Sequence, residues 1–208
     1  MSNDSYYTIE KAAIAEYKDR GSKFIAYAFP IKTMNEFKEK LAVIKKGHSK
    51  ATHHCFAYRI GMDGNNFRVS DDGEPSGTAG KPILGQLDSK GITNAKIIVV
   101  RYFGGTLLGK PGLINAYKTA AALALQITPV VQKPILVNFR LQFDYTILNE
   151  VMKILKQFSC TLVKQELQLF SMMEIGIPKN RIETVLVNFK NFKIEIEEIK
   201  NVNDYKKN

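Results

Sequence analysis

A glycine turn followed by a lysine lies within Arg101–Gly112, RYFGGTLLGKPG. Here Gly104-x-x-x-x-Gly109-Lys110 matches the first seven positions of a nucleotide-binding P-loop, whose backbone N–H groups surround the phosphates. The eighth position of a P-loop is a Ser or Thr that holds Mg²⁺, and here it is Pro111. Proline has no hydroxyl and fits best in the first turn of a helix. We therefore interpret the segment as a tight strand-to-helix turn, with or without an anion site.

The lysine–proline pair of this turn occurs twice, because Gly80-Lys81-Pro82 repeats the order of Gly109-Lys110-Pro111. A helix N-terminus carries free N–H groups and a partial positive charge, so a lysine there costs up to about 1 kcal/mol unless an anion is near. The anion at each turn is either an external phosphate or an internal carboxylate of Asp71, Asp72 or Glu74. We favour phosphate, and both alternatives stay open.

The acidic segment Ser70–Gly80, SDDGEPSGTAG, has the composition of a tight loop. Its carboxylates are of the kind that hold a hard cation, but the spacing of an EF-hand loop is absent. We therefore expect no metal and no cofactor. The structural interpretation is a turn-rich loop in which Ser76 or Thr78 caps the next helix. The carboxylates would then pair with nearby lysines or arginines.

Two imidazoles and a thiol follow one another in Ala51–Cys55, ATHHC. Successive residues of a strand point to opposite faces, so His53 and Cys55 share a side while His54 faces away. This geometry disfavours a zinc site, which needs further ligands at metal spacing, and a hydrolase that uses Cys55 or His54. We expect hydrogen-bonded, partly buried histidines.

The elements that position these residues form a mixed α/β arrangement in residues 1–133. Thr33 and Glu36 make a capping box at the start of a helix. A helix is predicted after the loop Ser70–Gly80, and another over Gly112–Gln126. Strands are predicted at Phe24–Phe29, His53–Ile60, Asn66–Val69 and Ala95–Val100.

Residues 134–208 show a separate pattern after Pro134. Alternation over Ile135–Phe143 predicts a half-buried strand, and Asp144 can cap the helix that follows. Further strands are predicted at Thr161–Leu169 and Phe170–Ile177, then a helix after Pro178 and a last strand with Phe192, Ile194 and Ile196 on one side. The order strand, helix, strand, strand, helix, strand is the split βαβ, ferredoxin-like pattern.

Charge points to the class of partner. The net charge is +10, and residues 1–133 carry 19 lysines and arginines against 11 aspartates and glutamates. This favours a polyanion such as RNA or the ribosome, or an acidic protein surface; solvated lysines on a basic protein are the alternative.

No run of 18 apolar residues and no signal peptide are present, so we expect a cytoplasmic protein without membrane contact. Two cysteines make no disulfide framework.

The residues quoted above resemble the Impact/YigZ family of small proteins. The resemblance is carried by Arg20–Phe24, Ala51–Cys55, Ser70–Pro82 and the segment from Val99 through Gly109-Lys110, and it covers essentially the whole chain. It implies an α+β fold in which residues 1–133 are similar to the second domain of ribosomal protein S5. It also implies that residues 134–208 are a ferredoxin-like domain similar to the last domain of translocating elongation factors. A translation-linked role is implied, without an established enzymatic activity.

We therefore predict a non-catalytic protein that binds RNA, the ribosome or a translation-associated partner. The alternative is an enzyme or binding protein for a nucleotide or phosphorylated small molecule at Gly104–Lys110. The predicted phosphate contacts are Lys23, Lys81, Arg101, Lys110, Arg20 and Arg68. The residues expected to organise the cleft are His53, His54, Asp71, Asp72, Glu74, Ser76, Thr78, Gly104 and Gly105.

Overall fold

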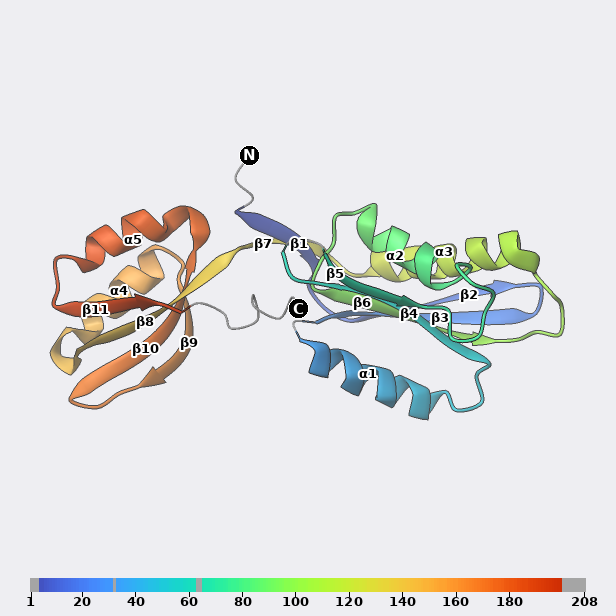
Figure 1. The fold of residues 1–208 in the computed structure, drawn as a ribbon, viewed down its shortest axis with the longest axis horizontal. Coiled ribbons are helices and arrows are strands. Elements are labelled where there is room, and N and C mark those ends of the chain that lie inside the picture. Colours follow the sequence, from blue (N-terminus) through green and yellow to red (C-terminus); the bar gives the residue numbers. More distant parts are fainter. Residues whose placement is uncertain (1–3, 32, 63–64, 200–208) are drawn as a thin grey trace, which may run out of the picture. The chain divides into compact units, whose positions relative to one another are not determined.

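A computed structural model describes residues 4–31, 33–62 and 65–199 (Figure 1). Residues 1–3 and 200–208, which belong to the two predicted domains, lie outside the described part. The described residues form two compact units, residues 6–133 and residues 134–199 with Asp4 and Ser5. Both units combine helices with strands, so the mixed α/β character predicted from the sequence is confirmed. Among the described residues, no helix is both long and apolar enough to span a membrane.

A five-stranded antiparallel sheet is the centre of residues 6–133. Its order is β2-β3-β6-β4-β5. The strands are β2 (Ala13–Asp19), β3 (Ser22–Pro30), β4 (His53–Ile60), β5 (Asn66–Ser70) and β6 (Ala95–Tyr102). Each strand predicted in this part of the chain lies within one of them. In addition, β1 (Ser5–Ile9) and β7 (Val130–Pro134) form a two-stranded sheet.

Helices cover both faces of the five-stranded sheet (Figure 1). On one side lies α1 (Met34–Gly47), which begins as predicted, because the Thr33 side chain accepts a hydrogen bond from the Glu36 N–H at 3.2 Å. On the other side lie α2 (Gly80–Asp88) and α3 (Gly109–Ile127). The last helix begins at Gly109 rather than at the predicted Gly112, because proline is tolerated in a first helical turn.

The strand β6 is buried on both faces, and this explains its continuous apolar run. Ile97 and Val99 belong to the core between the sheet and α2 and α3, whereas Ile98 and Val100 belong to the core between the sheet and α1. Alternation along one strand therefore supplies two hydrophobic layers.

The second unit contains a four-stranded antiparallel sheet in the order β11-β8-β10-β9. Along the chain its elements are β8 (Leu136–Asp144), η1 (Tyr145–Ile147), α4 (Leu148–Gln157), β9 (Thr161–Glu166), β10 (Phe170–Pro178), η2 (Lys179–Arg181), α5 (Ile182–Phe189) and β11 (Ile194–Glu198). The predicted order of strands and helices is observed. Asp144 caps η1, which leads into α4, by accepting the Thr146 N–H at 2.8 Å.

A single hydrophobic cluster joins this sheet to α4 and α5, which lie on the same face of it (Figure 1). Leu141 and Ile175 contribute from the strands, and Val151 and Phe189 from the helices. One boundary differs from the prediction. The strand expected to continue to Leu169 ends at Glu166, because the chain reverses there into β10.

Candidate functional site

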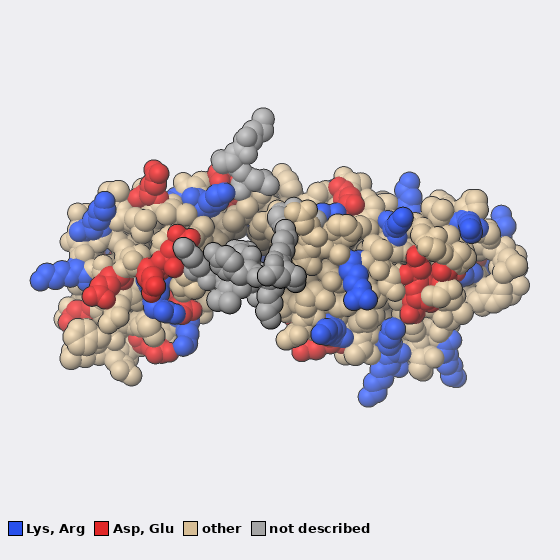
Figure 2. Space-filling model, in the orientation of Figure 1, with Lys and Arg blue, Asp and Glu red and all other residues tan. Residues whose placement is uncertain are grey.

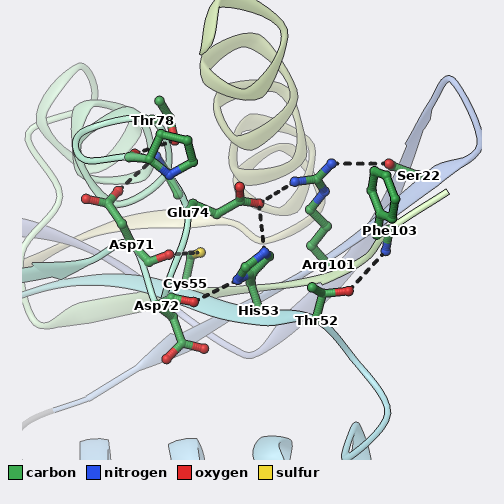
Figure 3. Close-up of polar contacts among 12 residues, drawn as sticks. Ser22, Thr52, His53, Cys55, Asp71, Asp72, Glu74, Thr78, Arg101 and Phe103 are labelled. Atoms are coloured by element: carbon green, nitrogen blue, oxygen red, sulfur yellow. Dashed lines mark hydrogen bonds and ion pairs between the residues drawn. The ribbon is translucent and has the colours of Figure 1, made fainter. Parts of the chain in front are cut away.

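The loop between β5 and α2 carries the acidic residues, and each is held by a different partner (Figure 3). Asp71 lies at the N-terminus of α2. Its Oδ1 accepts the N–H groups of Ala79 (3.0 Å) and Gly80 (2.8 Å), and its Oδ2 accepts the Gly77 N–H (2.9 Å). At this helix, therefore, the internal carboxylate is the anion, one of the two alternatives considered above.

The pKa of Asp71 reports this arrangement. Burial acts to raise the pKa, but the three backbone donors and nearby Lys81 outweigh it, so the pKa lies below its ordinary value. The Asp71 contacts also correct the prediction of which residue caps α2. Neither Ser76 nor Thr78 caps α2, because the Thr78 hydroxyl donates to the Pro75 carbonyl (2.7 Å) and Asp71 takes the free N–H groups.

Asp72 connects the loop to the start of β4. Its carboxylate accepts the His54 N–H at 2.7 Å and lies 3.6 Å from the Lys45 ammonium. Its carbonyl oxygen lies 2.7 Å from Nδ1 of His53. Because a carbonyl oxygen only accepts, this nitrogen carries the proton of a neutral His53 ring. The His54 ring lies on the other side, 3.2 Å from the His48 carbonyl, and burial lowers its pKa.

Glu74 is buried beside Arg101 (Figure 3). Its Oε1 accepts hydrogen bonds from Nη1 of Arg101 (2.6 Å) and the Tyr117 hydroxyl (2.7 Å), and lies 3.8 Å from Nε2 of His53. The Arg101 guanidinium also lies near the rings of Phe24 and Phe103, with its Nη2 3.4 Å from the Ser22 hydroxyl. This placement gives Arg101 an internal partner where a phosphate contact was predicted.

Cys55 does not have the environment of a nucleophile. Its thiol donates to the Asp71 carbonyl at 3.0 Å and lies 3.4 Å from the Tyr117 hydroxyl. Burial raises the pKa of the thiol well above its ordinary value. A protonated, buried thiol is a poor nucleophile. Within the described part of the chain, no group of three or more His, Cys, Asp or Glu side chains could hold a metal ion.

The glycine turn after β6 allows a close approach between two loops. The N–H of Gly104 donates to the Ser22 hydroxyl at 3.2 Å, and a Cβ atom on Gly104 would lie 1.9 Å from the carbonyl carbon of Gly21. Gly105 and Gly109 have φ of +86° and +71°, which favour glycine. The first turns of α2 and α3 contain no acidic residue, but the Asp71 carboxylate from the preceding loop accepts N–H groups at the start of α2.

The remaining predicted cations lie on the surface of residues 6–133. Lys23 pairs with Glu16 at 2.7 Å. The side chains of Arg20, Arg68 and Lys110 make no hydrogen bond or ion pair with any described residue, and the Lys81 ammonium acts on Asp71 as a neighbouring charge. Figure 2 shows an acidic cluster of this unit with lysine and arginine side chains around it.

The predicted cleft residues His53, His54, Asp71, Asp72 and Glu74 are therefore brought together by β4 and the β5–α2 loop. Tyr117 lies in the helix predicted over Gly112–Gln126 and Ser22 lies in the segment Arg20–Phe24, but neither was predicted as a site residue. Their hydroxyls form hydrogen bonds with residues 43 and 79–82 positions away in the sequence, so no local sequence pattern could reveal these contacts.

Comparison with known proteins yields one family. The model of the Impact N-terminal domain matches residues 20–125. IMPACT family member YvyE of Bacillus subtilis (strain 168) is 38% identical over 147 residues, 71% of this chain and 68% of its own. IMPACT family member YigZ of Escherichia coli (strain K12) is 33% identical over 167 residues, 79% and 80% of the two chains. A crystal structure of a hypothetical protein has a TM-score of 0.74 at 28% identity, covering 95% of this chain and 98% of its own.

Proposed function

The chain belongs to the Impact family, and from that premise we propose that it is a non-catalytic protein of translation that binds RNA or the ribosome through residues 6–133. The family resemblance implies a translation-linked role. We propose a cytoplasmic location, in keeping with that role.

One observation carries the proposal against an enzyme: the groups that could do chemistry are engaged with one another. Glu74 neutralises Arg101, Asp71 caps α2, and the Cys55 thiol is buried and protonated. A general acid or base must be able to reach a substrate and change protonation state near the working pH. These groups support a rigid loop rather than a reaction.

The surface cations support a polyanionic partner. Arg20, Arg68 and Lys110 extend from the unit without an internal carboxylate, so their charges are available to phosphates. Of the two Gly-Lys-Pro turns, the one at Lys81 is capped by the Asp71 carboxylate of the preceding loop, whereas the N-cap residue at the Lys110 turn makes no side-chain capping hydrogen bond. We therefore assign the stronger phosphate contact to Lys110.

The fold assignment is part of the same proposal. We propose that residues 1–133 are related to the second domain of ribosomal protein S5. We propose also that residues 134–208 are a ferredoxin-like domain, which the order β11-β8-β10-β9 supports. In this view the second domain supplies another contact surface for the translation-associated partner.

The test is binding of a labelled single-stranded RNA at several salt concentrations. We expect affinity to fall steeply with salt, and Lys110→Ala to reduce the slope of log K against log[salt] by about 0.7. Lys118→Ala is the matched control, because Lys118 is an exposed lysine of the same helix and its loss changes the net charge equally. RNA binding that is absent at low salt, or equal effects of the two variants, would contradict the proposal.

The rival function is recognition of a nucleotide or phosphorylated small molecule at Gly104–Lys110. The uncapped N-terminus of α3 is the observation that favours it. Isothermal titration calorimetry with ATP and GTP, with and without Mg²⁺, distinguishes this rival function from RNA binding. Tight binding of a mononucleotide that is lost in Lys110→Ala would support the rival; binding of RNA alone supports the proposal.

A further inference from the structure

The end of the five-stranded sheet carries a row of hydrogen-bond donors that the loop site does not use. Lys23 on β3 and Tyr102 on β6 are opposite one another in the strand register. Thr52 directly precedes β4, where its N–H donates to the Arg101 carbonyl at 2.8 Å and its hydroxyl accepts the Phe103 N–H at 3.3 Å, so it contacts the residues on both sides of Tyr102. We call Lys23, Tyr102 and Thr52 the strand-end row.

His48 lies behind this row and connects two phenols. Its Nε2 is 2.6 Å from the Tyr27 hydroxyl, and its Nδ1 is 2.8 Å from the Tyr102 hydroxyl. As the residue that ends α1, His48 is held in place by a backbone bond to the Ile44 carbonyl. The two tyrosines are half-buried, so their hydroxyls are positioned rather than mobile.

Counting protons shows that one donor is left over. A neutral imidazole has one N–H and one bare nitrogen, so one phenol donates to the ring and the other accepts from it. When Nδ1 carries the ring proton, the accepting phenol is Tyr102, which keeps its own O–H, and the described residues offer no acceptor for it. When Nε2 carries the proton, the remaining O–H is that of Tyr27, so the site proposed below requires the Nδ1–H form of His48.

The neighbours of the phenols are donors as well. The Lys23 ammonium has three N–H groups and, among the described residues, one acceptor, Glu16. Its pKa is raised chiefly by the hydrogen bond to Glu16, which outweighs the effect of burial. The Thr52 hydroxyl accepts the Phe103 N–H at 3.3 Å and keeps its own proton (Figure 3).

Because the strand-end row has more hydrogen-bond donors than acceptors, it favours a ligand that accepts hydrogen bonds and donates none. Glu16 is the carboxylate that contacts Lys23, and Lys18 shares it at 3.3 Å. Asp72 pairs with Lys45 and His54 instead. We propose that Lys23, Tyr102 and Thr52 bind a phosphate group, with Tyr27 and His48 orienting the Tyr102 phenol.

This site rests on the proposed function only for the source of the phosphate, which is then the RNA backbone. Its chemistry is equally that of free phosphate or a phosphorylated small molecule. The competing explanation gives His48 a purely structural task, anchoring the end of α1 to the sheet through Tyr27 and Tyr102. That task predicts a loss of stability in Tyr102→Phe without any effect on phosphate.

The experiment is a titration of the full chain with inorganic phosphate at constant ionic strength, followed by NMR of the His48 ring nitrogens and of the amides at Lys23, Thr52 and Tyr102. We expect saturable shifts, weakened about tenfold by Tyr102→Phe and by Lys23→Gln, because each removes a hydrogen bond to a charged ligand. Lys18→Gln is the matched control, since it removes the same charge and also contacts Glu16. It should change the affinity by less than about twofold.

Two results would overturn the site: shifts that do not saturate with phosphate, or a folded Tyr102→Phe variant that binds phosphate like the native chain. Thermal unfolding shows whether the variant is folded, and Thr52→Val provides a second test if it is not. Competition with single-stranded RNA identifies the source. If RNA displaces phosphate, the ligand is the nucleic-acid backbone. If phosphate binds but RNA does not, the site stands and the proposed RNA function fails. If RNA binding depends on Lys110 but phosphate gives no saturable shifts, the proposed RNA function stands and the phosphate site fails.

Discussion

Lys96 places an ammonium group in the apolar layer between the sheet and α1. The side chain is fully buried, its Nζ donates to the Phe37 carbonyl at 2.9 Å, and the rings of Phe29 and Phe37 lie 5.3 and 5.0 Å away. Burial, reinforced by nearby Lys40, lowers the pKa of Lys96 to about 8. Glu36 acts in the opposite direction but does not outweigh burial, and a buried charge costs free energy that a neutral side chain would not.

The expected pH dependence follows from the lowered pKa. The ordinary pKa of lysine is 10.5, so between pH 8 and 10.5 the unfolded chain binds more protons than the folded one. The free energy of unfolding should therefore rise with pH across this window, by on the order of 3 kcal/mol from Lys96, and gain nothing from Lys96 below it. Lys96→Met should abolish this rise and stabilise the protein at pH 7 by about 1–3 kcal/mol.

Urea unfolding from pH 7 to pH 10 measures the effect as the difference between native and Lys96→Met chains, which cancels the titration of other groups. Lys118→Met, on the exposed face of α3, serves as control. Parallel stability curves for native and Lys96→Met chains would show that Lys96 is not a buried cation.

Glu74 and Arg101 form a buried pair in which each member depends on the other. Glu74→Gln leaves the Arg101 guanidinium without a negative partner in a site where its Nε already has no hydrogen-bond acceptor. Breaking such a pair costs about 3–5 kcal/mol, so we expect a loss of that size in the free energy of unfolding. Urea denaturation at pH 7 measures it.

Because the two residues share one interaction, the double variant Glu74→Gln/Arg101→Gln should lose less than the sum of the single variants. An exposed pair offers the comparison: Glu166→Gln removes the partner of Lys164, and we expect a much smaller loss in the free energy of unfolding than at Glu74. Additive losses at Glu74 and Arg101 would show that the two side chains are not coupled.

At the scale of elements, α2 depends on a cap that is supplied from outside the helix. Asp71→Ala would leave the N–H groups of Ala79, Gly80 and Gly77 without their acceptor, and we expect a loss of about 2 kcal/mol. Ser76→Ala should change the free energy of unfolding by less than about 0.5 kcal/mol, because the described contacts give its hydroxyl no partner. Equal losses in the free energy of unfolding for Asp71→Ala and Ser76→Ala would show that the loop hydroxyl caps α2 as much as the Asp71 carboxylate does.

The pKa of Asp71 gives this cap a pH dependence of the same sense as that of Lys96 but at acidic pH, because both pKa values are lowered in the folded chain. The folded pKa lies below the ordinary value of 3.8, so the stabilisation is complete above pH 3.8 and is lost as pH falls through the folded pKa. Native and Asp71→Asn chains should therefore converge in stability at low pH. A difference that is unchanged on acidification would show that charge plays no part in the cap.

How far the sequence could predict these elements depends on the distance over which each signal acts. The alternation of β8, the Thr33 cap of α1 and the Asp144 cap before α4 involve neighbours within four residues, and they are confirmed. Asp71 reaches residues six to nine positions away, and Glu74 meets Arg101 across 27 positions. Residue type shows that Arg101 is a cation, but only the folded sheet buries it.

At the scale of the molecule, the two units have separate hydrophobic clusters and different charge. The clusters of the first unit are built from residues 9–125 on either side of its sheet, and that of the second from residues 137–196. Residues 1–133 carry 19 lysines and arginines against 11 acidic residues, whereas residues 134–208 carry 11 against 9. Phosphate binding should therefore be a property of the first unit.

This expectation can be tested with two variants that change the net charge equally. Arg20→Gln/Arg68→Gln removes two cations of the first unit, and Lys156→Gln/Lys190→Gln removes two exposed cations of the second. We expect the first pair to reduce the slope of log K against log[salt] for single-stranded RNA by about 1.4, since each phosphate contact contributes about 0.7. The second pair should leave the slope unchanged, because long-range attraction alone is largely screened at physiological salt. Equal slopes for the two variants would mean that RNA is attracted by net charge and not by cations at particular positions. A larger effect of Lys156→Gln/Lys190→Gln would place the RNA-binding face in residues 134–208.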